Sequence, residues 1–265
     1  MTEFKKWLDG PENVESAKEI AVQYDLHYYT HREEALNVFT HFLGVVFSVI
    51  GMVLMLIKAT TTLSYVSAVL CSAGFLTLYV NSTTYHAIQN PKIKAVMRKV
   101  DYCSVNLIVI SCGTGVAFLT GRYEGFIIYG VCLFLTALAL TLSLVNFRKF
   151  RMFSFATNFL IGGLLVGAYF ITGTHFTTTE LVLNAIGIVS VLIGSVLFVI
   201  HKPYIHAVFH VFVLVGPILF FILQIRDKAH RAPKHVQKYV VAVSNPGDRK
   251  VQAVQDRALS VLHSG

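Results

Sequence analysis

The sequence predicts an all-α membrane protein: a bundle of seven transmembrane helices with its N-terminus in the cytoplasm and its C-terminus on the opposite side. Of its 265 residues, 55% are hydrophobic and only 14% are charged, whereas soluble domains average about 25% charged residues. The charged residues gather at the two ends and in short clusters between long apolar runs. The bilayer rather than an aqueous core therefore sets the architecture.

Seven apolar stretches are each long enough to cross a hydrocarbon layer of about 30 Å as a helix of about 20 residues. We place them near residues 38–58, 62–81, 102–121, 125–146, 153–172, 179–200 and 205–226. They divide the chain into a polar leader (1–36), a seven-helix domain (37–226) and a polar, basic tail (227–265). The leader has no apolar core, so we do not expect it to be a cleaved signal peptide. Segments 15–22 and 31–36 within it have an amphipathic pattern.

Basic residues in the short loops predict the orientation, because cytoplasmic loops are enriched in lysine and arginine. With a cytoplasmic N-terminus, eight basic residues lie in inside loops and two in outside loops, although the basic tail argues the other way. The inside set is Lys92, Lys94, Arg98, Lys99, Arg148, Lys149, Arg151 and Lys202, and the outside set is Lys58 and Arg122. The formal net charge of +8 thus reflects topology and contact with anionic lipids, and it does not indicate nucleic-acid binding.

Small residues along two of the stretches predict close packing between helices. They are Gly44, Ser48 and Gly51 in the first stretch, and Gly162, Gly163 and Gly167 in the fifth. The four cysteines lie in or beside apolar stretches and form no Cys-x-x-Cys pair. We therefore expect small, buried, free thiols and no disulfide framework.

The most informative stretch is residues 201–210, HKPYIHAVFH, where the last apolar segment begins. His206 and His210 are four residues apart, which places both imidazoles on one helix face about one turn apart. Imidazole is the commonest metal ligand in proteins, and two at this spacing can hold one ion. Taken alone, the pair is weak evidence, because packed or solvated histidines are the more frequent cause of this spacing; His201 belongs to the preceding loop.

Further polar residues must lie at the same end of the bundle. Ser82 and His86, again four apart, close the second stretch, and Asp101 opens the third. Each crossing reverses the chain, so the end of the second stretch and the starts of the third and seventh share one side of the membrane in either orientation. Ionisable groups at such an edge indicate a functional site. His41, on the same side, is interpreted as a packing or hydrogen-bonding histidine.

This set of side chains has the composition of a catalytic zinc site. Three imidazoles, from His86, His206 and His210, leave one tetrahedral position for a water whose pKa zinc lowers to about 7. Asp101 would accept the proton of this water or hold it by a hydrogen bond, and Ser82 would orient the water or a substrate carbonyl. Structural interpretations stay open beside this one: Asp101 as a helix N-cap, Ser82 bonded to its own helix, and His86 among the lipid headgroups.

On these residues the chain resembles the hemolysin III family, within the superfamily of the progestin and adipoQ receptors and, more remotely, the alkaline ceramidases. The matching stretches are residues 34–41 with Gly44, 82–86, 98–101 and 206–210, and the resemblance runs from about residue 33 to residue 226. It implies a seven-helix bundle with a cytoplasmic N-terminus. It also implies a zinc ion near the inner leaflet, with His86, His206 and His210 as ligands, Asp101 bonded to the zinc-bound water, and Ser82 beside it.

The third stretch departs from the family pattern. After Gly113-Thr114 the family often has Tyr-Thr-Pro, whereas this chain has Gly115-Val116-Ala117. We therefore expect a third helix without the kink that the proline would impose, which changes the shape of a substrate cavity but leaves the ligands in place.

Two functions remain open from the sequence. One is hydrolysis of a lipid amide such as a ceramide, with the substrate class taken from the resemblance; the other is a receptor-like or structural protein in which zinc braces three helices. Membrane lipids are the expected partners, including a lipid substrate or ligand, in the plasma membrane or an internal membrane.

Other membrane-protein classes fit the residues poorly. No lysine for a retinal Schiff base lies in 211–225, and the acidic residues sit at the ends of the stretches rather than deep in them, unlike those of ion-coupled transporters. The motifs Asp-Arg-Tyr and Asn-Pro-x-x-Tyr of G-protein-coupled receptors are absent. A lytic pore would need a charged helix face, which the apolar stretches lack.

Overall fold

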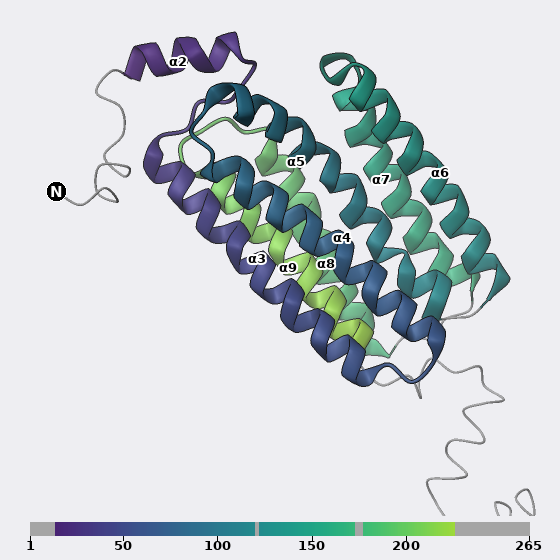
Figure 1. The fold of residues 1–265 in the computed structure, drawn as a ribbon. Helices are drawn as coiled ribbons and strands as arrows, with labels where there is room; N and C mark the ends of the chain where they lie inside the picture. The colour runs from purple at the N-terminus through teal and green to yellow at the C-terminus, as the bar shows by residue number, and fades with distance from the viewer. Residues whose placement is uncertain (1–13, 120–121, 173–176, 226–265) are drawn as a thin grey trace, which may run out of the picture.

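The computed structural model describes residues 14–119, 122–172 and 177–225, and these residues form helices and no strand. The α-helices are α2 (Val14–Gln23), α3 (His31–Lys58), α4 (Thr62–Ala87), α5 (Pro91–Cys112), α6 (Tyr123–Val145), α7 (Phe147–Ile171), α8 (Thr178–Phe198) and α9 (Ile205–Ile225). A π-helical segment, η1 (Gly115–Leu119), follows α5. Helices α3 to α9 form one elongated bundle, and α2 lies beyond one of its ends (Figure 1). The tail of residues 227–265 lies outside the described residues.

Six helices in the described part of the chain are long and apolar enough to cross a membrane: α3, α4, α6, α7, α8 and α9. Helix α5 is not among them, because three lysines, Arg98 and Asp101 make its first half charged. It nevertheless packs against α4, α6 and α7 inside the bundle. The all-helical class is therefore confirmed, while the count of seven crossings and the orientation of the termini stay predictions.

Helices near the candidate site extend further than hydrophobicity alone predicts. Helix α3 begins at His31 rather than at residue 38, so segment 31–36 is its first turns and not a separate amphipathic helix. Helix α4 continues to Ala87, and α5 begins at Pro91 rather than at residue 102. The polar residues that flank the apolar stretches consequently lie within helices, where their side-chain directions are fixed.

Capping residues explain these extended starts. Thr30 and Glu33 form a capping box: the Glu33 amide donates to the Thr30 hydroxyl at 3.3 Å, and the Thr30 amide donates to the Glu33 carboxylate at 2.9 Å. Asn90 caps α5 by accepting backbone N–H groups of its first turn, and Pro91 at the first helical position has no N–H to satisfy. Polar sequence signals, and not apolar periodicity, thus set where these helices begin.

Beside its apolar core the bundle buries many small and polar side chains, and it exposes many large apolar ones. Ser67, Asn106 and Ser154 are completely buried, and the amide of Asn106 donates to the Ser154 hydroxyl at 2.9 Å, joining α5 to α7. Large apolar residues such as Leu192 and Val196 of α8 point outward. This distribution suits a bundle surrounded by lipid, where small residues let helices approach and polar groups must be satisfied internally.

The cysteines behave as the sequence predicts. All four are free; Cys71, Cys103 and Cys132 are buried, and Cys112 is half-buried. Helices α4, α5 and α6 thus use them as small packing residues.

The predicted packing role of small residues holds in α3 and is wrong in α7. A Cβ added at Gly44 would overlap the ring of Tyr79 on α4, and one added at Gly51 would lie 2.8 Å from the ring of Phe221 on α9. Gly162, Gly163 and Gly167 of α7, in contrast, have no heavy atom within 4 Å of an added Cβ. The close helix contacts therefore join α3 to α4 and α9, the helices that carry the candidate ligands.

The expectation of an unbroken third helix is wrong. Helix α5 ends at Cys112 with Gly113 as its C-cap, and the chain then continues as the π-helical segment η1. Gly113 lies so close to Leu165 and Tyr129 that an added Cβ would be 2.8 Å from either side chain. Helix α5 thus ends at a closely packed glycine and without a proline.

A matched pair of glycine substitutions tests this packing. Alanine normally stabilises a helix interior by roughly 0.5–1 kcal/mol relative to glycine. At Gly44 it should instead lower the free energy of unfolding by about 1–3 kcal/mol, because Tyr79 is buried and its hydroxyl reaches the Val213 carbonyl at 3.4 Å. Gly163→Ala is the control and should be neutral or stabilising. Equal thermal unfolding temperatures of the two variants in detergent would contradict the packing.

Candidate functional site

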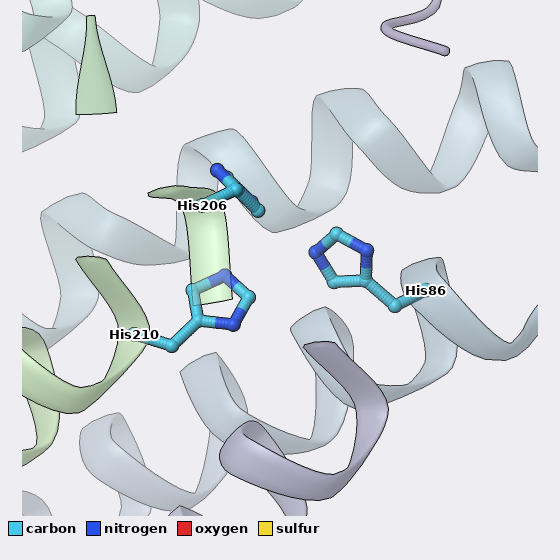
Figure 2. A group of neighbouring side chains, drawn as sticks. All are labelled: His86, His206 and His210. Carbon is cyan, nitrogen blue, oxygen red and sulfur yellow. The ribbon is translucent and has the colours of Figure 1, made fainter. Parts of the chain in front are cut away.

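Three histidines from two helices meet near one end of the bundle. His86 lies in the last turn of α4, and His206 and His210 lie on successive turns at the start of α9. Helix α3 packs against both of these helices and so fixes their separation. The rings of His206 and His210 face that of His86 across the interface, and one possible ligand atom from each lies within 4.8 Å of the other two (Figure 2). This group of three histidines, the triad, can hold a metal ion.

Two of the three histidines of the triad are fully buried. His86 is 0% and His210 is 2% exposed, and His206 is half-buried. The ring centroids of His206 and His210 are 4.4 Å apart, and that of His86 is 5.3 Å and 5.2 Å from them, respectively. Burying an imidazole nitrogen without a partner costs free energy, so this arrangement favours a bound group that uses the nitrogens. The interpretation of His86 as a residue among the lipid headgroups is wrong.

His86 is oriented by the Glu34 carboxylate of α3. Its Nδ1 lies 2.6 Å from Glu34 Oε2, and the Asn37 amide nitrogen lies 3.4 Å from the same Nδ1. The other ring nitrogen, Nε2, is buried and has no hydrogen-bond partner among the described residues. A neutral imidazole that donates Nδ1–H to a carboxylate presents the Nε2 lone pair on its opposite edge. This carboxylate–histidine arrangement is typical of metal ligands.

Lys94 of α5 holds Glu34 in place. Its Nζ lies 3.0 Å from Glu34 Oε1 and donates hydrogen bonds to the carbonyl oxygens of Tyr85 and Ile88, at 2.9 and 3.0 Å. The lysine is only 8% exposed, so it balances a buried carboxylate and also satisfies carbonyl groups at the end of α4. Although the sequence predicts a loop lysine at this position, the structure makes it part of the site's support.

Helix α3 also supports the α9 side of the triad. The Thr40 hydroxyl lies 3.0 Å from His210 Nδ1 and donates to the carbonyl oxygen of Leu36 at 2.9 Å. With its proton so used, the hydroxyl accepts from His210 Nδ1–H and leaves Nε2 free. Glu33 Oε1 accepts the Tyr204 amide at 2.9 Å, which fixes the start of α9, where Tyr204 has a left-handed φ of 62°.

Ser82 and Asp101 form a second pair beside the triad. Ser82 lies one turn before His86 on α4 and is 2% exposed, and its hydroxyl hydrogen-bonds the Asp101 carboxyl group of α5. The pair stands outside the three histidines whose ligand atoms meet. Because α5 begins at Pro91 with Asn90 as its N-cap, the interpretation of Asp101 as a helix cap is wrong.

The segment before α3 covers the triad. The Tyr29 ring centroid lies 5.1 Å from that of His206 and 5.8 Å from that of His86. Burial raises the pKa of the Tyr29 phenol, so it stays protonated. The ring centroid of His27 lies 4.9 Å from that of the exposed His201. Burial is the main cause that lowers the pKa of His27, and the nearby His201 is the second. Neutral aromatic groups therefore separate the triad from the end of the bundle.

Comparison with known proteins shows the family of this chain. Residues 29–221 match the family described as haemolysin-III related. The chain belongs to this hemolysin III family. It is 26% identical over 200 residues to the Hemolysin-3 homolog of Bacillus subtilis (strain 168), covering 73% of this chain and 93% of the relative. It is 24% identical over 195 residues to Hemolysin-3 of Bacillus cereus, covering 72% and 89%. No solved structure matches the chain.

The family and the six apolar helices together establish an integral, multi-pass membrane protein. The resemblance to hemolysin III proteins noted in the sequence is thereby confirmed. A lipid environment follows from the spanning helices.

No role for the residues that support the triad of this hemolysin III protein could be assigned from the sequence. Glu34, Asn37 and His41 follow at intervals of three and four, which places them on one face of α3. That spacing of polar residues at the start of an apolar helix was the available signal. His41 is 4% exposed, packs edge-on against His210 at a centroid distance of 3.7 Å, and has no hydrogen-bond partner among the described residues. It contacts the triad through ring packing, and both of its ring nitrogens are buried without a partner in the described part of the chain.

A double-mutant cycle tests the buried pair. Glu34→Gln and Lys94→Met should each lower the free energy of unfolding by about 3 kcal/mol, because each leaves an uncompensated buried charge. The double variant should lose much less than the sum, since neither charge remains. The measurement is the free energy of unfolding of each detergent-solubilised variant, obtained by titration with a denaturing detergent.

Lys92→Met is the control for this cycle, because Lys92 is exposed on the same helix. It should leave stability within about 0.5 kcal/mol of the wild type. Additive losses at Glu34 and Lys94 would contradict their direct coupling.

Proposed function

We propose that this protein binds one zinc ion through His86, His206 and His210 and uses the site to hydrolyse a lipid amide. The observation that carries the proposal is the state of His86: its Nδ1 is bonded to Glu34, while its Nε2 is buried, unpartnered and close to two more imidazoles. Three nitrogen donors suit zinc. They also leave a tetrahedral position free, as catalytic rather than structural zinc sites do.

The chain's own residues would divide the work of hydrolysis. Zinc, when bound, would supply a water acidic enough to react near neutral pH. Asp101 would act as general base and return the proton to the leaving amine. Ser82 would hold the Asp101 carboxyl by its hydrogen bond, and Glu34 and Thr40 would orient the imidazoles through their Nδ1 atoms.

The membrane arrangement that we propose has seven crossings, with α5 as the third, and a cytoplasmic N-terminus. The place of α5 between α4, α6 and α7 supports its counting as a crossing. The basic residues at the triad's end of the bundle, including Arg98, Arg148 and Lys149, support a cytoplasmic location of the site. The substrate class comes from the resemblance to the alkaline ceramidases and from the lipid around the bundle.

A second function, zinc as a structural brace in a receptor-like protein, is favoured by a different observation. His86 and His210 are almost completely buried, and Tyr29 lies over the end of the triad. A closed site of this kind would lock α4 to α9 rather than admit a substrate. Both functions need the same ligands, so the role of Asp101 distinguishes them.

Metal content tests the site common to both functions. The protein purified in detergent should contain about one zinc per chain. His86→Ala and the double variant His206→Ala/His210→Ala should contain none, because two or fewer imidazoles bind zinc weakly. Elemental analysis beside His201→Ala, an exposed histidine outside the triad, is the measurement. A folded wild-type protein that stays free of metal in zinc-containing buffer would overturn the proposal.

Asp101→Asn separates the enzyme from the brace. If the protein is a hydrolase, this substitution should keep the zinc and lower the release of fatty acid from a ceramide by about 10²–10⁴-fold, the usual contribution of a general base. Glu124→Gln is the matched control, a carboxylate removed at the opposite end of the bundle, and it should retain full activity. Unchanged activity of Asp101→Asn, or a zinc-loaded wild type that releases no fatty acid, would favour the brace.

A further inference from the structure

A cavity of about 470 Å³ lies away from the triad, where three segments of the chain come together. Its walls are the segment that follows α2, the charged first half of α5, and the turn that joins α6 to α7. The lining residues are Gln23, Tyr24, Asp25, Ala95, Arg98, Lys99, Leu144, Val145, Asn146, Phe147 and Arg148. The cavity therefore lies at one end of the bundle, beside the last residues of the membrane-crossing helix α6.

Positive charge dominates this cavity. Arg98 and Lys99 enter from α5 and Arg148 enters from α7, whereas Asp25 is the one acidic residue that lines it. Asp25 Oδ2 lies 3.1 Å from Arg98 Nη1 and 3.4 Å from Arg148 Nε. One carboxylate cannot neutralise two guanidinium groups, and Lys99 makes no ion pair with the residues that the structure describes. The lining thus carries an excess of two positive charges.

The two arginines already converge on an anionic oxygen. Both guanidinium groups form an ion pair with Oδ2 of Asp25. Two guanidinium groups that converge in this way from two helices can also bind the oxygens of a phosphate. Arg98 is held in position by the Asp25 carbonyl oxygen and by the Phe147 ring, whose centroid lies 5.6 Å from its guanidinium carbon. Asp25 itself has a left-handed φ of 53°, a conformation that is uncommon for residues other than glycine.

One wall of the cavity is apolar and exposed. Leu144 and Val145, at the end of α6, are 74% and 76% exposed, and Phe147 lies beside them. A basic pocket next to exposed apolar side chains at the end of a spanning helix suits a molecule that joins an anionic head to an acyl chain. Basic pockets of this kind between transmembrane helices bind anionic lipid headgroups.

We propose that this cavity binds the phosphate of an anionic phospholipid, with the headgroup against Arg98, Lys99 and Arg148 and the acyl chains along the end of α6. The site is independent of the metal site, because none of its residues belongs to the triad or its supporting network. An occupied cavity would also fix the segment after α2 against the bundle, since Asp25 and the lipid share the same two arginines.

Native mass spectrometry of the full chain tests the proposal. The purified protein in detergent is titrated with phosphatidylglycerol or with phosphatidylcholine of the same acyl composition. The wild type should bind the anionic lipid at least about tenfold more tightly than the neutral one. Lys99→Gln/Arg148→Gln should lose most of this preference, because it removes two of the three cations.

Lys92→Gln/Lys149→Gln is the matched control, since it removes the same charge from exposed lysines outside the cavity. It should keep the preference, and both double variants should unfold at the wild-type temperature. Equal losses in the two variants would reduce the effect to general surface charge and overturn the site, as would a wild type without a preference.

A competition arm identifies the source of the phosphate. Inorganic phosphate at millimolar concentration should leave phosphatidylglycerol bound if the acyl chains contribute as proposed. Complete displacement by inorganic phosphate would overturn the lipid assignment and identify a soluble anion as the ligand.

Discussion

The buried Glu34 carboxylate is the contact on which the arrangement of the candidate site depends. It lies between His86, 2.6 Å away, and Lys94, 3.0 Å away, and thereby connects α3, α4 and α5 at one point. A carboxylate in a low-dielectric interior is costly unless it is paired and fully hydrogen-bonded. The lysine supplies the charge balance and the histidine supplies a donor. The contact with His86 satisfies Glu34 and also directs the Nε2 edge of His86 toward α9. The stability of the helix junction and the geometry of the triad therefore depend on the same contact.

The bilayer explains why such a network forms on helix α3. In lipid, apolar side chains gain little from burial between helices, so small and polar residues at helix contacts contribute much of the association. Helix α3 follows this rule, with Gly44 and Gly51 against aromatic rings and Glu34, Asn37 and Thr40 against the histidines. Its start is set by the capping box at Thr30 and Glu33, which extends the helix beyond its apolar part. Without that extension, Glu34 would lie in a loop and could not orient His86.

Much of this architecture could be predicted from the sequence, because length and hydropathy set the helices and parity sets which of their ends meet. The meeting of His86 with His206 and His210 follows from that parity and from a spacing of four residues. The roles of Glu34, Thr40 and Lys94 could not be predicted, since they depend on the rotation of α3 and α5 about their own axes. The same limit explains the glycines of α7, which have the right spacing for packing but face no neighbour. Helix α5 ends at the closely packed Gly113, and no proline in the sequence predicts that end.

The most direct test of the central claim, that the triad is an open metal site held by three imidazoles, is zinc X-ray absorption spectroscopy of the purified protein. We predict a first shell of four light atoms near 2.0–2.1 Å, with the outer-shell scattering of three imidazole rings and one further oxygen. Glu34→Gln should disorder the imidazole scattering without removing the first shell. A shell that contains sulfur, a shell of oxygen alone, or a fourth imidazole that closes the site would contradict the account.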